Sequence, residues 1–209
     1  MRWTVPNILT VARLLAAPGV PIMFLYLHRP WADFAALALF ILAAITDWFD
    51  GYLARAWKQQ SRFGAMLDPI ADKAMVVIAI VVITGYSGMN PWLILPATVI
   101  LFREVFVSGL REFLGADAGR LAVTPLAKWK TTAQMVAIAV LFLATGLAFI
   151  EAGRPPIVGE PGLPWGVSWA ALANKAGLAL IWIAAGLTAI TGWDYFQKAL
   201  PFLRDHRHD

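Results

Sequence analysis

Four aspartates, Asp47, Asp50, Asp68 and Asp72, lie in one short stretch of a chain that carries 13 acidic residues in all. Asp47 and Asp50 are separated by three positions and Asp68 and Asp72 by four, so on helices each pair shares one face. Four converging carboxylates repel one another unless some are protonated or a cation joins them. Hard oxygen ligands with neither Cys nor His beside them suit Mg²⁺, Mn²⁺ or Ca²⁺. The pattern therefore predicts a site for one or two divalent ions that polarise a phosphoryl group.

The residues around the aspartates are small or basic. Gly51 and Ala54 leave space beside the first pair, and Gly64 precedes Asp68 by four positions. Arg55 offers a planar fork of donors that matches a phosphate group. Small residues also allow membrane helices to pack closely, which is the alternative interpretation of each glycine taken alone. Together with four aspartates and an arginine, they favour a pocket for a phosphorylated ligand.

The composition places these residues in a membrane protein. Hydrophobic residues make up 60% of the 209 positions and charged residues 14%, whereas a soluble domain carries about 25% charged residues. The mean hydropathy is +0.67. Because the chain has no cysteine, a disulfide framework, a thiolate metal site and a cysteine nucleophile are excluded.

Six stretches are expected to be membrane-spanning helices, each of which needs about 20 mostly apolar residues. They run from Pro6 to Leu27, Trp31 to Ala56, Phe63 to Tyr86, Pro91 to Phe113, Leu126 to Ile150 and Ala170 to Ala199. The predicted fold class is an all-α integral membrane protein with six transmembrane helices. Residues 1–209 are expected to form a single membrane-embedded catalytic domain.

The lysines and arginines predict the orientation in the membrane. Six crossings put both termini on one side, and that side collects all 17 basic residues except Arg29, Arg154 and Lys175. Basic residues concentrate on the cytoplasmic side, so we expect both termini in the cytoplasm. The connection between the second and third helices is short, which makes these helices antiparallel neighbours. The two aspartate pairs are then at the same depth, near the cytoplasmic face.

Read as one string, the aspartates and their neighbours resemble the complete signature of the CDP-alcohol phosphotransferase family. The string is D-x2-D-G-x2-A-R-x8-G-x3-D-x3-D, and its fixed positions are Asp47, Asp50, Gly51, Ala54, Arg55, Gly64, Asp68 and Asp72. Four further segments resemble the phosphatidylglycerophosphate synthase branch of that family. They are Pro6-Asn7-x-x-Thr10-x-x-Arg13, Thr46-Asp47-Trp48-Phe49-Asp50-Gly51, Arg103-Glu104-x6-Arg111-Glu112 and Lys128-x-Lys130-Thr131-Thr132-x-Gln134. The resemblance covers most of residues 4–135.

The resemblance implies a fold, a reaction and partners. The implied fold is the six-helix CDP-alcohol phosphotransferase fold, with two Mg²⁺ or Mn²⁺ ions at the cytoplasmic face of a bacterial inner membrane. The implied reaction transfers the phosphatidyl group of CDP-diacylglycerol to sn-glycerol 3-phosphate and releases CMP, a step of phospholipid biosynthesis. Membrane lipid and a second copy of the chain, in a homodimer, are the expected partners, and no nucleic acid is expected.

The resemblance also assigns roles to the residues of the string. Asp47, Asp50 and Asp68 would be metal ligands, and Asp72 would be both a ligand and the base for the acceptor hydroxyl, so that Asp68 and Asp72 are the candidate catalytic pair. The cytidine and its phosphates would be held by Gly51, Ala54, Arg55 and Gly64.

The phosphate of the acceptor needs cations. The basic residues available at the same membrane face are Arg103, Arg111, Lys128, Lys130 and, inside the first helix, Arg13. The alternative for each is a side chain that only extends to the membrane surface.

Other interpretations stay open at this point. An enzyme of the same family with inositol phosphate, serine or phosphatidylglycerol as acceptor would share the aspartate string. The basic residues favour a phosphorylated acceptor over serine, but they do not separate glycerol phosphate from inositol phosphate. A divalent-cation transporter, from another class, predicts acids near mid-membrane on several helices, whereas here they gather at one face of two helices. Glu104 and Glu112 are expected either to pair with arginines or to face the pocket, and Asp194 to be a polar partner in the bundle.

Overall fold

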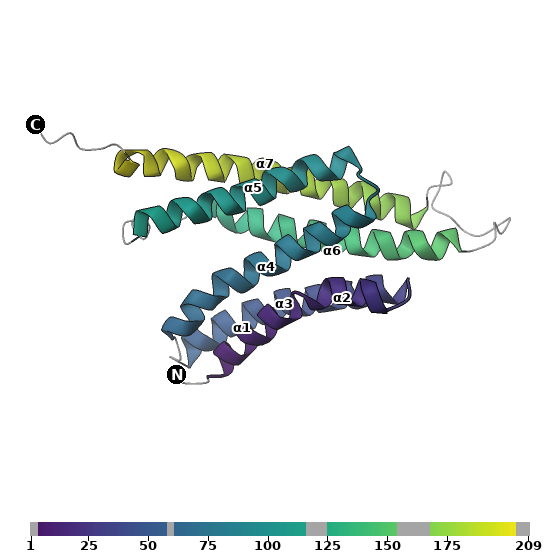
Figure 1. Cartoon of the computed structure of the whole chain (residues 1–209), viewed down its shortest axis with the longest axis horizontal. Coiled ribbons are helices and arrows are strands. Elements are labelled where there is room, and N and C mark those ends of the chain that lie inside the picture. Colours follow the sequence, from purple (N-terminus) through teal and green to yellow (C-terminus); the bar gives the residue numbers. More distant parts are fainter. Residues whose placement is uncertain (1–3, 58–60, 116–124, 154–167, 204–209) are drawn as a thin grey trace, which may run out of the picture.

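The computed structural model is a bundle of helices (Figure 1). It describes residues 4–57, 61–115, 125–153 and 168–203, and within these ranges the side chains other than those of 48, 50–55, 125–128 and 203. The helices are α1 (Val5–Ala16), α2 (Gly19–Tyr26), α3 (Trp31–Ala56), α4 (Arg62–Tyr86), α5 (Pro91–Leu114), α6 (Pro125–Ala152) and α7 (Trp169–Leu203). No strand occurs in the described ranges, which confirms the all-α prediction.

The first predicted span is not one helix. The sequence predicted a continuous helix from Pro6 to Leu27, but α1 and α2 meet at a break with a bend of 40°. Pro18 lies at this break, where it has no N–H to donate and its ring displaces the carbonyl four residues earlier. The prediction was therefore wrong at this proline.

Local capping explains where α4 and α5 begin. Ser61 precedes α4, and its Oγ accepts a hydrogen bond from the Gly64 N–H at 2.9 Å. Asn90 precedes α5, and its Oδ1 accepts from the Trp92 N–H at 3.0 Å. Such side chains satisfy N–H groups that the first turn of a helix leaves without partners.

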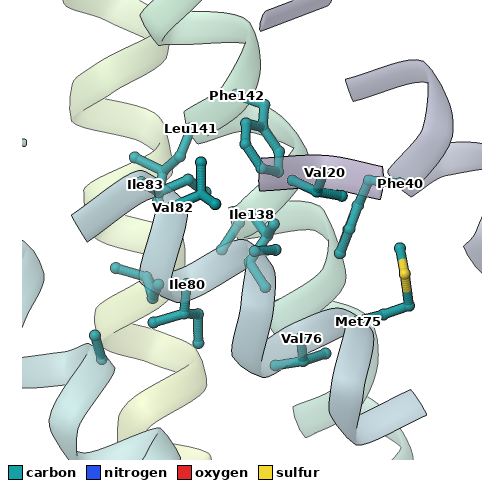
Figure 2. Packing of buried hydrophobic residues seen from close by; sticks show 14 of the residues in the cluster. Val20, Phe40, Met75, Val76, Ile80, Val82, Ile83, Ile138, Leu141 and Phe142 are labelled. Atoms are coloured by element: carbon teal, nitrogen blue, oxygen red, sulfur yellow. The ribbon is translucent and has the colours of Figure 1, made fainter. Parts of the chain in front are cut away.

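The apolar core takes buried side chains from α2, α3, α4, α5, α6 and α7. Figure 2 shows Val20 and Phe40 lying near Ile138 and Phe142 of α6. All four side chains are at most 2% exposed. Because lipid tails are as apolar as these side chains, the cluster stabilises a membrane bundle through close van der Waals packing.

The apolar surface of the bundle is that of a membrane protein. On α5 alone, Phe102, Val105 and Phe113 are 69%, 73% and 73% exposed. Among the described residues, three helices are long and apolar enough to cross a membrane, and the α1–α2 pair makes a fourth if it counts as one span. A membrane protein is therefore supported, while six crossings stay a prediction.

The helix ends near the aspartates lie together at one end of the bundle. In Figure 1, α1 and α4 begin, and α3, α5 and α7 end, on the left side of the view. The ends of α3 and α4 that carry the aspartates therefore lie at the same end of the bundle as the last turns of α5 and α7.

Candidate active site

One face of α1 is polar and points at the aspartates. Asn7, Thr10 and Arg13 recur at intervals of three residues, and all three are buried. Thr10 Oγ1 donates to Asp68 Oδ1 at 2.7 Å, and Asn7 Oδ1 accepts from Ser61 Oγ at 2.8 Å. These bonds tie α1 to the start of α4.

Arg13 lies at the centre of the carboxylates. Its Nη1 is 2.8 Å from Asp72 Oδ1 and also contacts Asp47 Oδ1, while its Nη2 is 3.9 Å from Asp68 Oδ1. The Arg13 side chain is 2% exposed, and those of Asp47, Asp68 and Asp72 are 38%, 48% and 44% exposed. A buried guanidinium needs such partners, because an unpaired buried charge is strongly unfavourable.

Three of the four predicted metal ligands therefore meet around one point. Asp47 comes from α3, and Asp68 and Asp72 come from α4, as their spacing predicted. The side chain of Asp50 lies outside the described residues. No group of three or more His, Cys, Asp or Glu side chains arranged to hold a metal ion occurs among the described residues. The donors nevertheless suit a hard divalent cation chemically, because they are carboxylate oxygens that already gather around one positive charge.

Gly64, one of the residues predicted to hold the donor, packs closely against Asn7 of α1. A Cβ added at Gly64 would lie 2.7 Å from Asn7 Oδ1 and 3.3 Å from Ser61 Oγ. Gly64 therefore allows α1 to approach α4, and a contact with the cytidine stays a prediction. The side chains of Ala54 and Arg55, and the surroundings of Gly51, lie outside the described residues.

A cavity of about 280 Å³ lies beside the aspartates, between α4, α5, α6 and α7. Its charged lining residues are Asp72, Lys73, Arg103, Glu104, Arg111, Lys130 and Asp194. Three of the five predicted acceptor residues, Arg103, Arg111 and Lys130, line it. Arg13 is not among its lining residues, and the side chain of Lys128 lies outside the described residues. Asp72 thus belongs both to the carboxylate cluster and to the wall of a basic cavity.

The cavity wall is held together by polar contacts between helices. Arg111 Nε donates to Tyr195 Oη of α7 at 3.3 Å, with the guanidinium 5.4 Å from the ring centre. The Arg103 side chain packs over Gly192, where an added Cβ would lie 2.9 Å from Arg103 Cγ. Two of the basic residues are therefore positioned by α7.

The structure shows the contacts of the acids Glu104 and Asp194. It also places in the cavity wall two residues that had no predicted site role. Glu104 contacts Arg103 and Lys130 and also lines the cavity, so both expected roles hold. Asp194 pairs with Lys198, one turn further along α7, at 2.7 Å and also lines the cavity, so its expected role as a polar partner in the bundle stays a prediction. Lys73 and Tyr195 also line the cavity. Lys73 adjoins Asp72 in the sequence, which was a usable signal, whereas nothing in the sequence singled out Tyr195.

Comparison with known proteins identifies the family of the chain. The family model of CDP-alcohol phosphatidyltransferases matches residues 3–190. The chain is 67% identical over 226 residues to the CDP-diacylglycerol–glycerol-3-phosphate 3-phosphatidyltransferase of Cereibacter sphaeroides, covering 99% of this chain and 100% of that protein. It is 40% identical over 208 residues to the protein of the same name from Escherichia coli K12, covering 98% of this chain and 100% of that protein. With the aspartate string, the basic cavity and these end-to-end matches, the chain belongs to the CDP-alcohol phosphatidyltransferase family.

Proposed function

We propose that the chain transfers the phosphatidyl group of CDP-diacylglycerol to sn-glycerol 3-phosphate, giving phosphatidylglycerophosphate and CMP. The observation that carries this proposal is the position of Asp72, which contacts Arg13 within the carboxylate cluster and lines the basic cavity. A donor held at the cluster and an acceptor held in the cavity would meet at this side chain. The names of the two relatives support the same donor and acceptor.

The acceptor carries an anionic phosphate, and the cavity offers the cations to bind it. Arg103, Arg111 and Lys130 line the wall on α5 and α6. Arginine presents a fork that binds phosphate through two parallel hydrogen bonds, and lysine adds a point charge. With its phosphate held there, the acceptor would direct its primary hydroxyl toward Asp72.

The transfer is a single displacement at phosphorus. The hydroxyl oxygen of the acceptor forms a bond to the lipid-side phosphorus, and the bond from that phosphorus to the CMP oxygen breaks. Asp72 takes the hydroxyl proton, and CMP leaves with the electron pair. Positioning and charge neutralisation supply most of the rate in phosphoryl transfer of this kind.

A pair of divalent ions, Mg²⁺ or Mn²⁺, is part of the proposal. Asp47, Asp50, Asp68 and Asp72 would hold them, since carboxylate oxygens are the ligands these ions prefer. When bound, the ions neutralise charge on the donor pyrophosphate. Gly51, Ala54 and Arg55 would contact the cytidine and its phosphates.

A lipid donor fits the surroundings of the site. An apolar cavity of about 340 Å³ lies between α3 and α6, lined by Phe40, Ile41, Ala44, Ile45, Met135, Val136 and Ala139. Met135 also lines the basic cavity. An acyl chain in the apolar cavity would therefore place its headgroup beside Asp72.

The proposal includes a location and an assembly. We propose six crossings of a bacterial inner membrane, both termini in the cytoplasm, the active site at the cytoplasmic face, and a homodimer. The distribution of Lys and Arg along the chain supports the orientation.

A comparison of acceptors tests the function. Purified protein in detergent would receive CDP-diacylglycerol and Mg²⁺ with sn-glycerol 3-phosphate, inositol phosphate, serine or phosphatidylglycerol. We expect CMP release with sn-glycerol 3-phosphate alone, and none after chelation. Release with a different acceptor only would overturn the assignment of the basic cavity. No release with any acceptor, from folded protein, would favour a divalent-cation transporter.

A further inference from the structure

Glu104 joins two of the cations that line the basic cavity. Its Oε1 contacts Lys130 Nζ of α6 and lies 3.2 Å from Nη1 of Arg103, its neighbour on α5. All three side chains line the cavity and are largely buried, with exposures of 13% for Glu104, 7% for Lys130 and 17% for Arg103. The carboxylate therefore sits between two cations that would otherwise face each other.

Glu104 also lies on a second polar connection across the cavity wall. Ser108 Oγ donates to the backbone carbonyl of Glu104 at 2.5 Å, and Lys73 Nζ of α4 contacts the same Ser108 Oγ. Residues 104 and 108 of α5 thus link to a lysine of α4 and a lysine of α6. In a poorly solvated wall, like charges repel strongly, so an anion among these cations keeps them close together.

Lysine needs such a partner more than arginine does. Its ammonium ends a flexible chain of four carbons, whereas arginine presents a rigid fork. Within the described structure, Arg111 has Tyr195 and Arg103 packs over Gly192, but the carboxylate that contacts Lys130 is that of Glu104. Loss of this carboxylate would let the Lys130 ammonium leave the cavity wall.

We propose that Glu104 is a positioning residue that holds the Lys130 ammonium in the cavity, ready for the phosphate of the acceptor. This inference rests on the proposed function. In this role Glu104 acts through its contact with Lys130 and not as a ligand of either substrate. Its removal would therefore weaken use of the phosphorylated acceptor and leave use of the CDP-linked donor unchanged.

Steady-state kinetics of Glu104→Gln, with each substrate varied in turn, tests the proposal. We expect KM for sn-glycerol 3-phosphate to rise on the order of tenfold, the usual effect of losing a hydrogen bond between charged groups. KM for CDP-diacylglycerol should stay within about twofold, since no donor contact is lost. The matched control is Glu112→Gln, the same change at an exposed position of α5 that does not line the cavity. It should behave as wild type.

A double variant separates action through Lys130 from a general structural role. If Glu104 acts through Lys130, Glu104→Gln adds nothing to the acceptor KM of Lys130→Gln. Additive effects in the double variant, or a lower kcat with both KM values unchanged, would overturn the proposal. If Glu104→Gln does not fold, Glu104→Asp is measured instead. This variant keeps the negative charge but moves it away from Lys130 by one methylene. It must then raise the acceptor KM selectively, and an unchanged acceptor KM would overturn the proposal.

The wild-type protein in the same assay distinguishes failure of the proposed function from failure of the proposed role of Glu104. Wild-type protein that releases no CMP with sn-glycerol 3-phosphate would refute the proposed function itself. An active wild type whose variants show no selective change in the acceptor KM would refute only the role of Glu104.

Discussion

Arg13 Nη1 lies 2.8 Å from Asp72 Oδ1 and so joins the first helix to the helix that carries two of the site's aspartates. The same guanidinium contacts Asp47 and approaches Asp68. One buried cation thus gathers three carboxylates from α3 and α4. The residues expected to hold a divalent ion are organised around a positive charge that belongs to the chain.

Replacement of Arg13 tests this organisation. Arg13→Ala should lower the free energy of unfolding by about 1–3 kcal/mol, less than for a fully buried pair because the aspartates are partly exposed. If the carboxylates are metal ligands, Mg²⁺ should raise the Tm of Arg13→Ala more than that of wild type, since the ion no longer competes with the guanidinium. Thermal unfolding in detergent, with and without Mg²⁺, measures both. An equal Mg²⁺ effect in the two proteins would contradict a shared site.

Asp72 should be indispensable for turnover. Asp72→Asn keeps the size of the side chain but cannot take a proton, so we expect the rate of CMP release to fall by ~10²–10⁴-fold. Asp68→Asn should also remove most activity. Size-exclusion profiles and Tm values would check that both variants fold. Near wild-type turnover by folded Asp72→Asn would exclude it as the base.

Gly64 should matter for packing of α1 against α4. Gly64→Ala places a Cβ 2.7 Å from Asn7 Oδ1, so Asn7 must turn away and lose its bond to Ser61. We expect a cost of about 1–3 kcal/mol, as in other overpacked positions, measured as a lower Tm. The double variant Asn7→Ala/Gly64→Ala should be no less stable than Asn7→Ala alone. A further drop in the double variant would show that Asn7 is not the contact that matters.

The ion pair of Arg29 with the buried Asp33, at the opposite end of the bundle, should stabilise the fold without taking part in catalysis. Arg29 Nε and Nη2 donate to the two carboxylate oxygens of Asp33 at 2.8 and 2.6 Å, and Nη2 also donates to the Thr145 carbonyl of α6 at 3.1 Å. Asp33 is fully buried, and its hydrogen bond raises the pKa of Arg29.

Arg29→Ala leaves the Asp33 carboxylate buried without this partner. We expect a loss of roughly 3–5 kcal/mol in the free energy of unfolding, seen as a lower Tm. The KM values of the protein that remains folded should equal those of wild type. A selective change in either KM would show that this end of the bundle communicates with the site.

The sequence predicted the meeting of Asp47 with Asp68 and Asp72, because spacings of three and four on two antiparallel helices leave few other arrangements. It did not predict that Arg13 would contact all three, since the rotation of α1 depends on packing between distant segments. The contact between Glu104 and Lys130 likewise depends on how α5 and α6 are placed in the bundle. The break at Pro18 was missed because the apolar stretch around it is long enough for one span.

Transfer of label from the acceptor into lipid tests the central claim most directly. Purified protein would be incubated with CDP-diacylglycerol, Mg²⁺ and isotopically labelled sn-glycerol 3-phosphate, followed by extraction of the lipids and measurement of CMP. We expect the label in phosphatidylglycerophosphate, with one CMP released for each labelled lipid, and both products formed at least ~10²-fold more slowly by Asp72→Asn. Label that stays in the aqueous phase while the folded protein is saturated with both substrates would contradict the proposed transfer.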